Sequence, residues 1–111
     1  MGWLENVERE LSRARDAVQG GHHGRARTSA RRAAGVAIAE LQQRVPGTFY
    51  GSDFIKQLRM FAEDPSIPGD VRSSANRLQA RLSENFTSLS ENPLADAATI
   101  VGYIRDRLDK I

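Results

Sequence analysis

The sequence of 111 residues has no cysteine and only two histidines. The lack of cysteine excludes disulfide-stapled modules and thiolate chemistry, and two histidines are too few for a classical zinc site. Aromatic residues are also scarce, at 6% of the chain. The longest run of small apolar residues, positions 33–39, is far shorter than the roughly 20 residues that span a bilayer. A membrane-spanning protein is therefore not expected.

Lysine is almost absent, since Lys56 and Lys110 are the only two and the other 14 basic residues are arginine. The formal net charge is only +2, so the overall charge does not indicate a nucleic-acid partner. The charge is unevenly spread, however. Residues 1–56 carry nine basic against six acidic side chains, and residues 57–111 carry seven against eight. A binding site for an anion is therefore expected in the first half.

Apolar side chains recur at spacings of three and four along five segments, and no segment alternates as a strand would. The first two stripes predict helices from about residue 3 to 19 and from about 26 to 45. The Gly20–Gly21 pair between them favours a short turn and an antiparallel hairpin.

The remaining stripes predict three further helices, which are punctuated by proline. We expect a short one at about 54–62, one of some twenty residues at about 71–89, and a last one that begins at Asn92–Pro93. Together the five stripes predict one all-α domain over residues 1–111, an up-and-down antiparallel bundle of four to five helices.

Four arginines crowd the start of the second predicted helix. Positive charge is unfavourable there because the helix macrodipole is itself positive at that end, so a partner should neutralise it. One hypothesis is a bound nucleotide or RNA phosphate. The other is ion pairing with the carboxylates of the first helix, Glu5, Glu8, Glu10 and Asp16. The ligand-binding residues predicted here are Arg25, Arg27, Arg31 and Arg32.

The side of the second helix that faces away from its apolar stripe is unusually small, with Thr28, Gly35 and Ala39. Glycine destabilises an exposed helix by about 1 kcal/mol relative to alanine, so we infer that a second element packs there. That element is either part of the same chain, with this helix at the centre of the bundle, or a second copy in a homodimer.

Motifs that would carry catalysis are missing. The glycine-rich turn Gly20–Gly24 precedes an arginine-rich helix, but it follows no strand and meets neither phosphate-binding fingerprint, so a plain hairpin turn is the better interpretation. His22 and His23 are adjacent and lack the same-face spacing of a helical metal pair. Carboxylates fall singly, without the pairing with histidine of a di-metal bundle. The arginines of the fourth helix, Arg72, Arg77 and Arg81, are expected on its solvated face. We predict no catalytic residue, no metal site and no cofactor.

Two segments resemble the HEPN domains, a family of small four- to five-helix proteins. The alanine-rich stretch of residues 26–37 is similar to that family's second helix, and residues 93–108 are similar to its last. The resemblance implies a homodimer that binds nucleotide or nucleic acid, or that pairs with a nucleotidyltransferase-type protein. Many members are ribonucleases with an arginine followed by histidine in the last helix. Here Arg105 and Arg107 are followed by no histidine, which disfavours ribonuclease activity.

The leading hypothesis is therefore a non-catalytic HEPN-like module that dimerises and binds nucleotide or RNA phosphate through the arginines of the second helix. The alternative is a structural or protein-interaction bundle whose arginines are all paired internally. The first eight residues contain acids where a signal peptide needs basic residues, so we expect a cytoplasmic protein.

Overall fold

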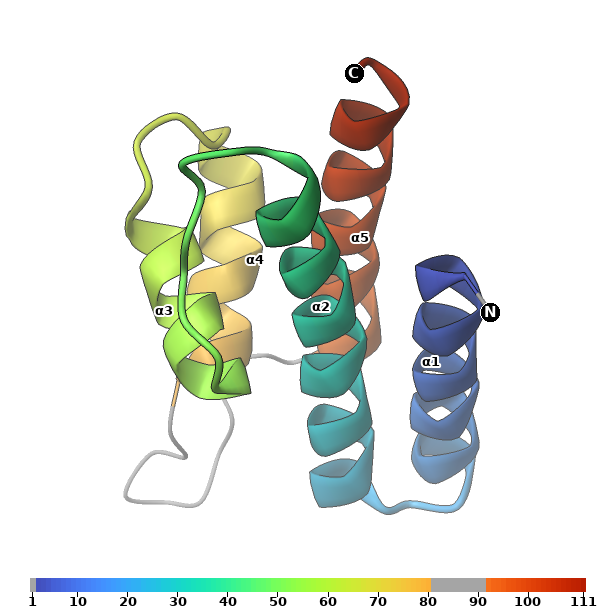
Figure 1. Cartoon of the computed structure of the whole chain (residues 1–111). Coiled ribbons are helices and arrows are strands. Elements are labelled where there is room, and N and C mark those ends of the chain that lie inside the picture. The colour runs from blue at the N-terminus through green and yellow to red at the C-terminus, as the bar shows by residue number, and fades with distance from the viewer. Residues whose placement is uncertain (1, 81–91) are drawn as a thin grey trace.

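The computed structural model describes residues 2–80 and 92–111, and this part of the chain forms a bundle of five α-helices without strands (Figure 1). The helices are α1 (Trp3–Gln19), α2 (His23–Arg44), α3 (Phe54–Glu63), α4 (Gly69–Gln79) and α5 (Pro93–Asp109). The predicted all-α bundle is confirmed. Over the described residues, no helix combines the length and the apolar character needed to cross a membrane.

Helix α2 is the centre of the bundle, because it packs extensively on α1 and α5 and also contacts α3 and α4. Helices α1 and α2 form the expected antiparallel hairpin, and α3 and α4 form a second one (Figure 1). The connection between α2 and α3 is different, since residues 45–53 return along the bundle and α2 and α3 therefore rise in the same direction (Figure 1).

The apolar stripes meet in a single core. Phe61 of α3 is fully buried, and its ring makes edge-to-face contacts with Tyr50 and Tyr103 at centroid distances of 5.5 and 6.3 Å. Short helices in proteins are stabilised mainly by the packing of their apolar faces against each other. The apolar stripes therefore hold the bundle together. The largest fully buried side chains are Phe61, Ile38, Leu41, Leu58, Leu78, Ile100, Ile104 and Val7.

The predicted length of the fourth helix was wrong. Helix α4 ends at Gln79, and Ala80 has the extended backbone angles φ −63° and ψ 144°, although the apolar spacing of Leu78, Leu82, Phe86 and Leu89 continues. The carbonyls of Leu78 and Ala80 both accept hydrogen bonds from the guanidinium of Arg31. These tertiary bonds satisfy the free carbonyls at the end of the helix. The remainder of the predicted helix lies outside the described residues.

The returning segment 45–53 is fixed by polar contacts that the sequence pattern does not predict. The backbone N–H of Tyr50 donates to the side chain of Gln42, and the buried Gln57 donates to the carbonyl of Gly51 at 2.8 Å. Gly51 has φ +113°, a conformation that favours glycine. The hydroxyl of Tyr50 donates to Asp64 at 2.5 Å, which ties this segment to the turn after α3.

We predict that this Tyr50–Asp64 contact makes the free energy of unfolding decrease as the pH falls through the acidic range. The hydrogen bond from Tyr50, followed by bonds from Ser66, lowers the pKa of Asp64 in the folded state. A lowered carboxyl pKa stabilises the fold above the unfolded value of about 4, and this stabilisation is lost as the pH falls. Tyr50→Phe should therefore lower the free energy of unfolding at pH 7 by about 1 kcal/mol, and by less near pH 2.

Urea denaturation of both proteins across that pH range measures the difference. Tyr103→Phe is the matched control, because the hydroxyl of Tyr103 contacts Arg107 and not Asp64. An equal effect of Tyr50→Phe at both pH values would contradict the assignment.

Candidate anion-binding pocket

The backbone N–H groups of the turn between α1 and α2 point back to α1. The N–H groups of Gly20, Gly21 and His22 donate to carbonyls of the last turn of α1, with His22 N to Ala17 O at 2.7 Å. Gly21 adopts φ +77°, as is common where a helix ends in a left-handed residue. The interpretation of Gly20–Gly24 as a plain hairpin turn agrees with this geometry.

The four arginines in the first half of α2 do not act together. Arg31 is partly buried, and its Nε and Nη2 atoms donate to the carbonyls of Leu78 at 2.7 Å and Ala80 at 3.0 Å. The positive charge thus lies at the C-terminal, negative end of α4, where the macrodipole favours it. Burial, and to a lesser extent the charge of Arg27, lower the pKa of Arg31. These bonds give Arg31 a structural role between α2 and α4.

The internal ion pairs expected between α1 and α2 do not form. The carboxylates of α1 that are paired use arginines of their own helix, with Glu10 bound by Arg13 at 2.8 Å and Glu8 by Arg15 at 3.9 Å. No salt bridge joins the two helices within the described residues. Arg27, which is half-buried one turn before Arg31, likewise makes no ion pair there.

Arg25 and Arg32 are exposed and line a pocket of about 620 Å³ between the end of α1 and the start of α2. Arg13 reaches the same pocket from α1, as does His22 from the turn. Neither Arg25 nor Arg32 has an ion-pair partner in the described structure. The complete lining is Arg13, Asp16, Ala17, His22, Gly24, Arg25, Thr28, Ser29 and Arg32.

The electrostatics of this pocket favour an anion. Arg25 and Arg32 line it without an ion-pair partner among the described residues, Arg13 is paired with Glu10, and the one carboxylate in the lining is that of Asp16. The first turn of α2 contains no acidic residue, and no side chain caps its N-terminus, so the positive macrodipole at this end adds to the charge of Arg25. Guanidinium groups also bind phosphate and carboxylate oxygens in a bidentate manner. The lining of the pocket therefore offers groups of the kind that bind phosphate or carboxylate oxygens.

The sequence predicts four candidate ligand arginines at the start of α2, and two of them, Arg25 and Arg32, line this pocket. The anion site in the first half of the chain stays a prediction. From the sequence, Asp16 is connected with the arginines of α2 only as an ion-pair partner, and Arg13 and His22 are not connected with them. The predicted hairpin could have indicated this contact, because a short turn brings the last turn of one helix beside the first turn of the next.

The small face of α2 has a partner within the chain. Gly35 is buried beneath Phe54 of α3, and a Cβ atom at this position would lie 2.1 Å from the ring atom Cδ1 of Phe54. Ala39 is half-buried, and Thr28 is exposed at the pocket. The central-helix alternative thus accounts for Gly35, while the homodimer remains a prediction.

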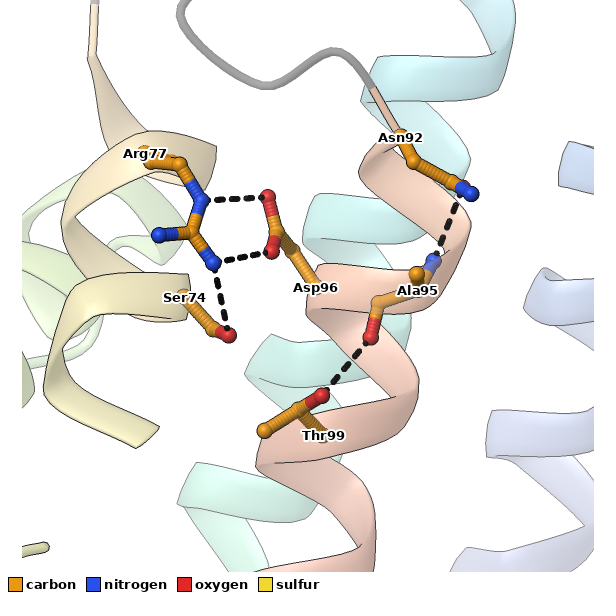
Figure 2. A network of polar contacts seen from close by, with 6 residues as sticks. All are labelled: Ser74, Arg77, Asn92, Ala95, Asp96 and Thr99. Carbon is orange, nitrogen blue, oxygen red and sulfur yellow. Dashed lines mark hydrogen bonds and ion pairs between the residues drawn. The ribbon is translucent and has the colours of Figure 1, made fainter. Parts of the chain in front are cut away.

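Arg77 of α4 is exposed, as expected for a solvated face, and Arg72 is half-buried, but both also bond to neighbouring parts of the fold. Arg77 binds Asp96 of α5 with both nitrogens of its fork, at 2.8 and 3.4 Å, and also donates to Ser74 (Figure 2). Asp96 is buried, and its carboxylate raises the pKa of Arg77. Arg72 donates to the carbonyl of Ala62 at the end of α3. Arg81 lies outside the described residues.

Among residues 2–80 and 92–111, no three histidine or acidic side chains form a group that could hold a metal ion. The comparisons with known proteins add no family, because no family model, curated protein or solved structure matches the chain.

Proposed function

We propose that this protein is a non-catalytic, HEPN-like helical binding module that holds the phosphate of a nucleotide or of RNA in the α1–α2 pocket. The observation that carries the proposal is the pair of exposed arginines, Arg25 and Arg32, which line one pocket without an ion-pair partner among the described residues. Arg25 lies in the first turn of α2, where a free positive charge is unfavourable unless an anion joins it.

Other arginines of the protein bond within the fold, which sets them apart from Arg25 and Arg32. Arg31, Arg72 and Arg77 all have hydrogen-bonded partners within the fold. These three arginines are thus explained by contacts within the fold, without a ligand. The same contacts favour the second candidate, a structural or protein-interaction bundle, but that candidate gives no reason for the free pair Arg25 and Arg32.

The homodimer and the nucleotidyltransferase-type partner are proposals that come from the HEPN resemblance alone. Because Phe54 covers Gly35, a dimer would have to use a different surface from the glycine-centred face of α2. Cytoplasmic location is likewise proposed from the sequence.

Isothermal titration of the wild-type protein with inorganic pyrophosphate at low ionic strength tests the phosphate site. We expect saturable binding with one site per chain that weakens as salt is added. The double variant Arg25→Gln/Arg32→Gln should bind at least tenfold more weakly. Glutamine has nearly the helix propensity of arginine, and removing like charges from the start of α2 does not destabilise it.

Arg59→Gln/Arg105→Gln is the matched control, because it removes two exposed arginines from α3 and α5. It should bind pyrophosphate as the wild type does. Equal binding by the wild type and the Arg25/Arg32 variant, or an equal loss in the control, would reject the pocket and leave the structural bundle.

A further inference from the structure

The pocket between α1 and α2 displays both signs of charge at once. Asp16 lines it together with Arg13, Arg25 and Arg32, yet the carboxylate of Asp16 makes no ion pair with any of them in the described structure. Arg13 is turned to Glu10 instead, at 2.8 Å. A molecule that enters the pocket therefore meets a negative group as well as positive ones.

The negative charge of Asp16 and the positive charge of Arg25 each lie at a helix end where the macrodipole is unfavourable to that charge. Asp16 lies in the last turn of α1, which has no basic residue, and Arg25 lies in the first turn of α2, which has no acidic one. The macrodipole favours the opposite arrangement at each end. Residues that are locally unfavourable for stability concentrate at functional sites. Asp16 and Arg25 are two such residues, and they line the same pocket.

The pocket suits a small molecule better than a polymer. Its volume of about 620 Å³ falls in the range of roughly 300–1,000 Å³ that is usual for small-ligand sites. Beyond Arg32 the same helix has no further charge until Glu40, which is paired with Arg44 at 2.9 Å. Between them Phe54 covers Gly35. No basic track therefore leads from the pocket along α2 for a long phosphate backbone to follow.

We propose that the pocket selects a small phosphate ester that also carries a hydroxyl or ammonium hydrogen-bond donor, with Asp16 as the residue that accepts from this donor. This inference rests on the proposed function, in which Arg25 and Arg32 hold the phosphate. An ionised carboxylate only accepts hydrogen bonds. Asp16 therefore repels the phosphate itself and favours an ester whose second group can donate, which makes it a specificity-determining residue.

The test is calorimetric titration of the wild type and of Asp16→Asn with three esters. Methyl phosphate has no further donor, glucose 1-phosphate offers hydroxyls, and O-phosphoethanolamine offers an ammonium group. We expect Asp16→Asn to weaken binding of one or both donor-bearing esters about tenfold, since hydrogen bonds to a charged group are the stronger ones. Methyl phosphate should bind about twofold more tightly, because a like charge is removed. The ester that loses affinity identifies the donor.

The matched control is Asp106→Asn, an exposed aspartate of α5, which should leave all three affinities unchanged. If Asp16→Asn strengthens binding of all three esters alike, or changes the affinity of none, Asp16 does not accept a hydrogen bond from the ester. The inference is then overturned, while the phosphate site stands. If none of the esters binds to the wild type, or if Arg25→Gln/Arg32→Gln binds them equally well, the proposed function fails together with it.

Discussion

Phe61→Ala is expected to lower the free energy of unfolding by about 3–5 kcal/mol, the usual cost of truncating a fully buried phenylalanine. Its ring is 0% exposed and joins two other aromatic rings, Tyr50 of the returning segment and Tyr103 of α5. The truncation removes both edge-to-face contacts and leaves a cavity. Domains of this size have a total stability of about 5–15 kcal/mol, so the variant should be close to unfolding at physiological temperature.

Urea denaturation followed by circular dichroism at the helical band measures this loss. Phe49→Ala provides the matched control, because Phe49 belongs to the same returning segment as Tyr50 and is 75% exposed. We expect that control to remain within about 0.5 kcal/mol of the wild type, as surface substitutions usually do. A similar loss for both variants would mean that the core is not centred on Phe61.

Arg31→Ala is expected to lower the free energy of unfolding by about 2 kcal/mol. The substitution removes two charge-assisted hydrogen bonds, at 2.7 and 3.0 Å, and leaves the carbonyls of Leu78 and Ala80 without this partner. It also removes a positive charge from the negative end of α4. Arg31→Lys should recover only part of the loss, because one ammonium group cannot reproduce the planar fork of a guanidinium.

The matched control for Arg31 is Arg27→Ala, one turn earlier on α2. Arg27 makes no hydrogen bond or ion pair within the described residues, and its charge lowers the pKa of Arg31, so its removal should be neutral or slightly stabilising. Thermal unfolding of the three variants distinguishes the two arginines. If Arg27→Ala costs as much as Arg31→Ala, the tie between α2 and α4 is not the cause.

The helices could be predicted because their signals are local. The stripe of α1 is followed by Gly20 and Gly21. The helix α5 has Asn92 as its cap, which accepts from the N–H of Ala95 at 3.1 Å (Figure 2), and Pro93 as its first residue. Capping and periodicity depend only on residues within a few positions of each other, so the sequence alone is sufficient for them.

The contact at the end of α4 could not be predicted, because it joins residues 47 positions apart along the chain. The apolar spacing continues past Gln79, but the Arg31 guanidinium binds the carbonyls of Leu78 and Ala80 from another helix. Tertiary contacts of this kind override local propensity. In the returning segment 45–53 the same holds for the bonds from Gln42 and Gln57, whereas the turn bond from Thr48 N–H to the Val45 carbonyl is local.

The candidate site was predicted in part for a related reason. Four arginines at the start of α2 could be recognised as an unfavourable cluster, but their individual roles depend on which neighbours each one meets. Arg31 lies against α4, whereas Arg25 and Arg32 open into a pocket shared with Asp16 of α1. The helical period places residues on faces, and only the packing of the whole bundle shows what each face meets.

The central claim is that the arginines of α2 are divided, with Arg31 holding the fold and Arg25 and Arg32 holding a phosphate. Heteronuclear NMR of the arginine Nε–Hε groups during titration with inorganic pyrophosphate tests it most directly. The claim predicts that the signals of Arg25 and Arg32 shift and saturate together, while the signal of Arg31 stays in place. Movement of the Arg31 signal along with unchanged signals of Arg25 and Arg32 would contradict it.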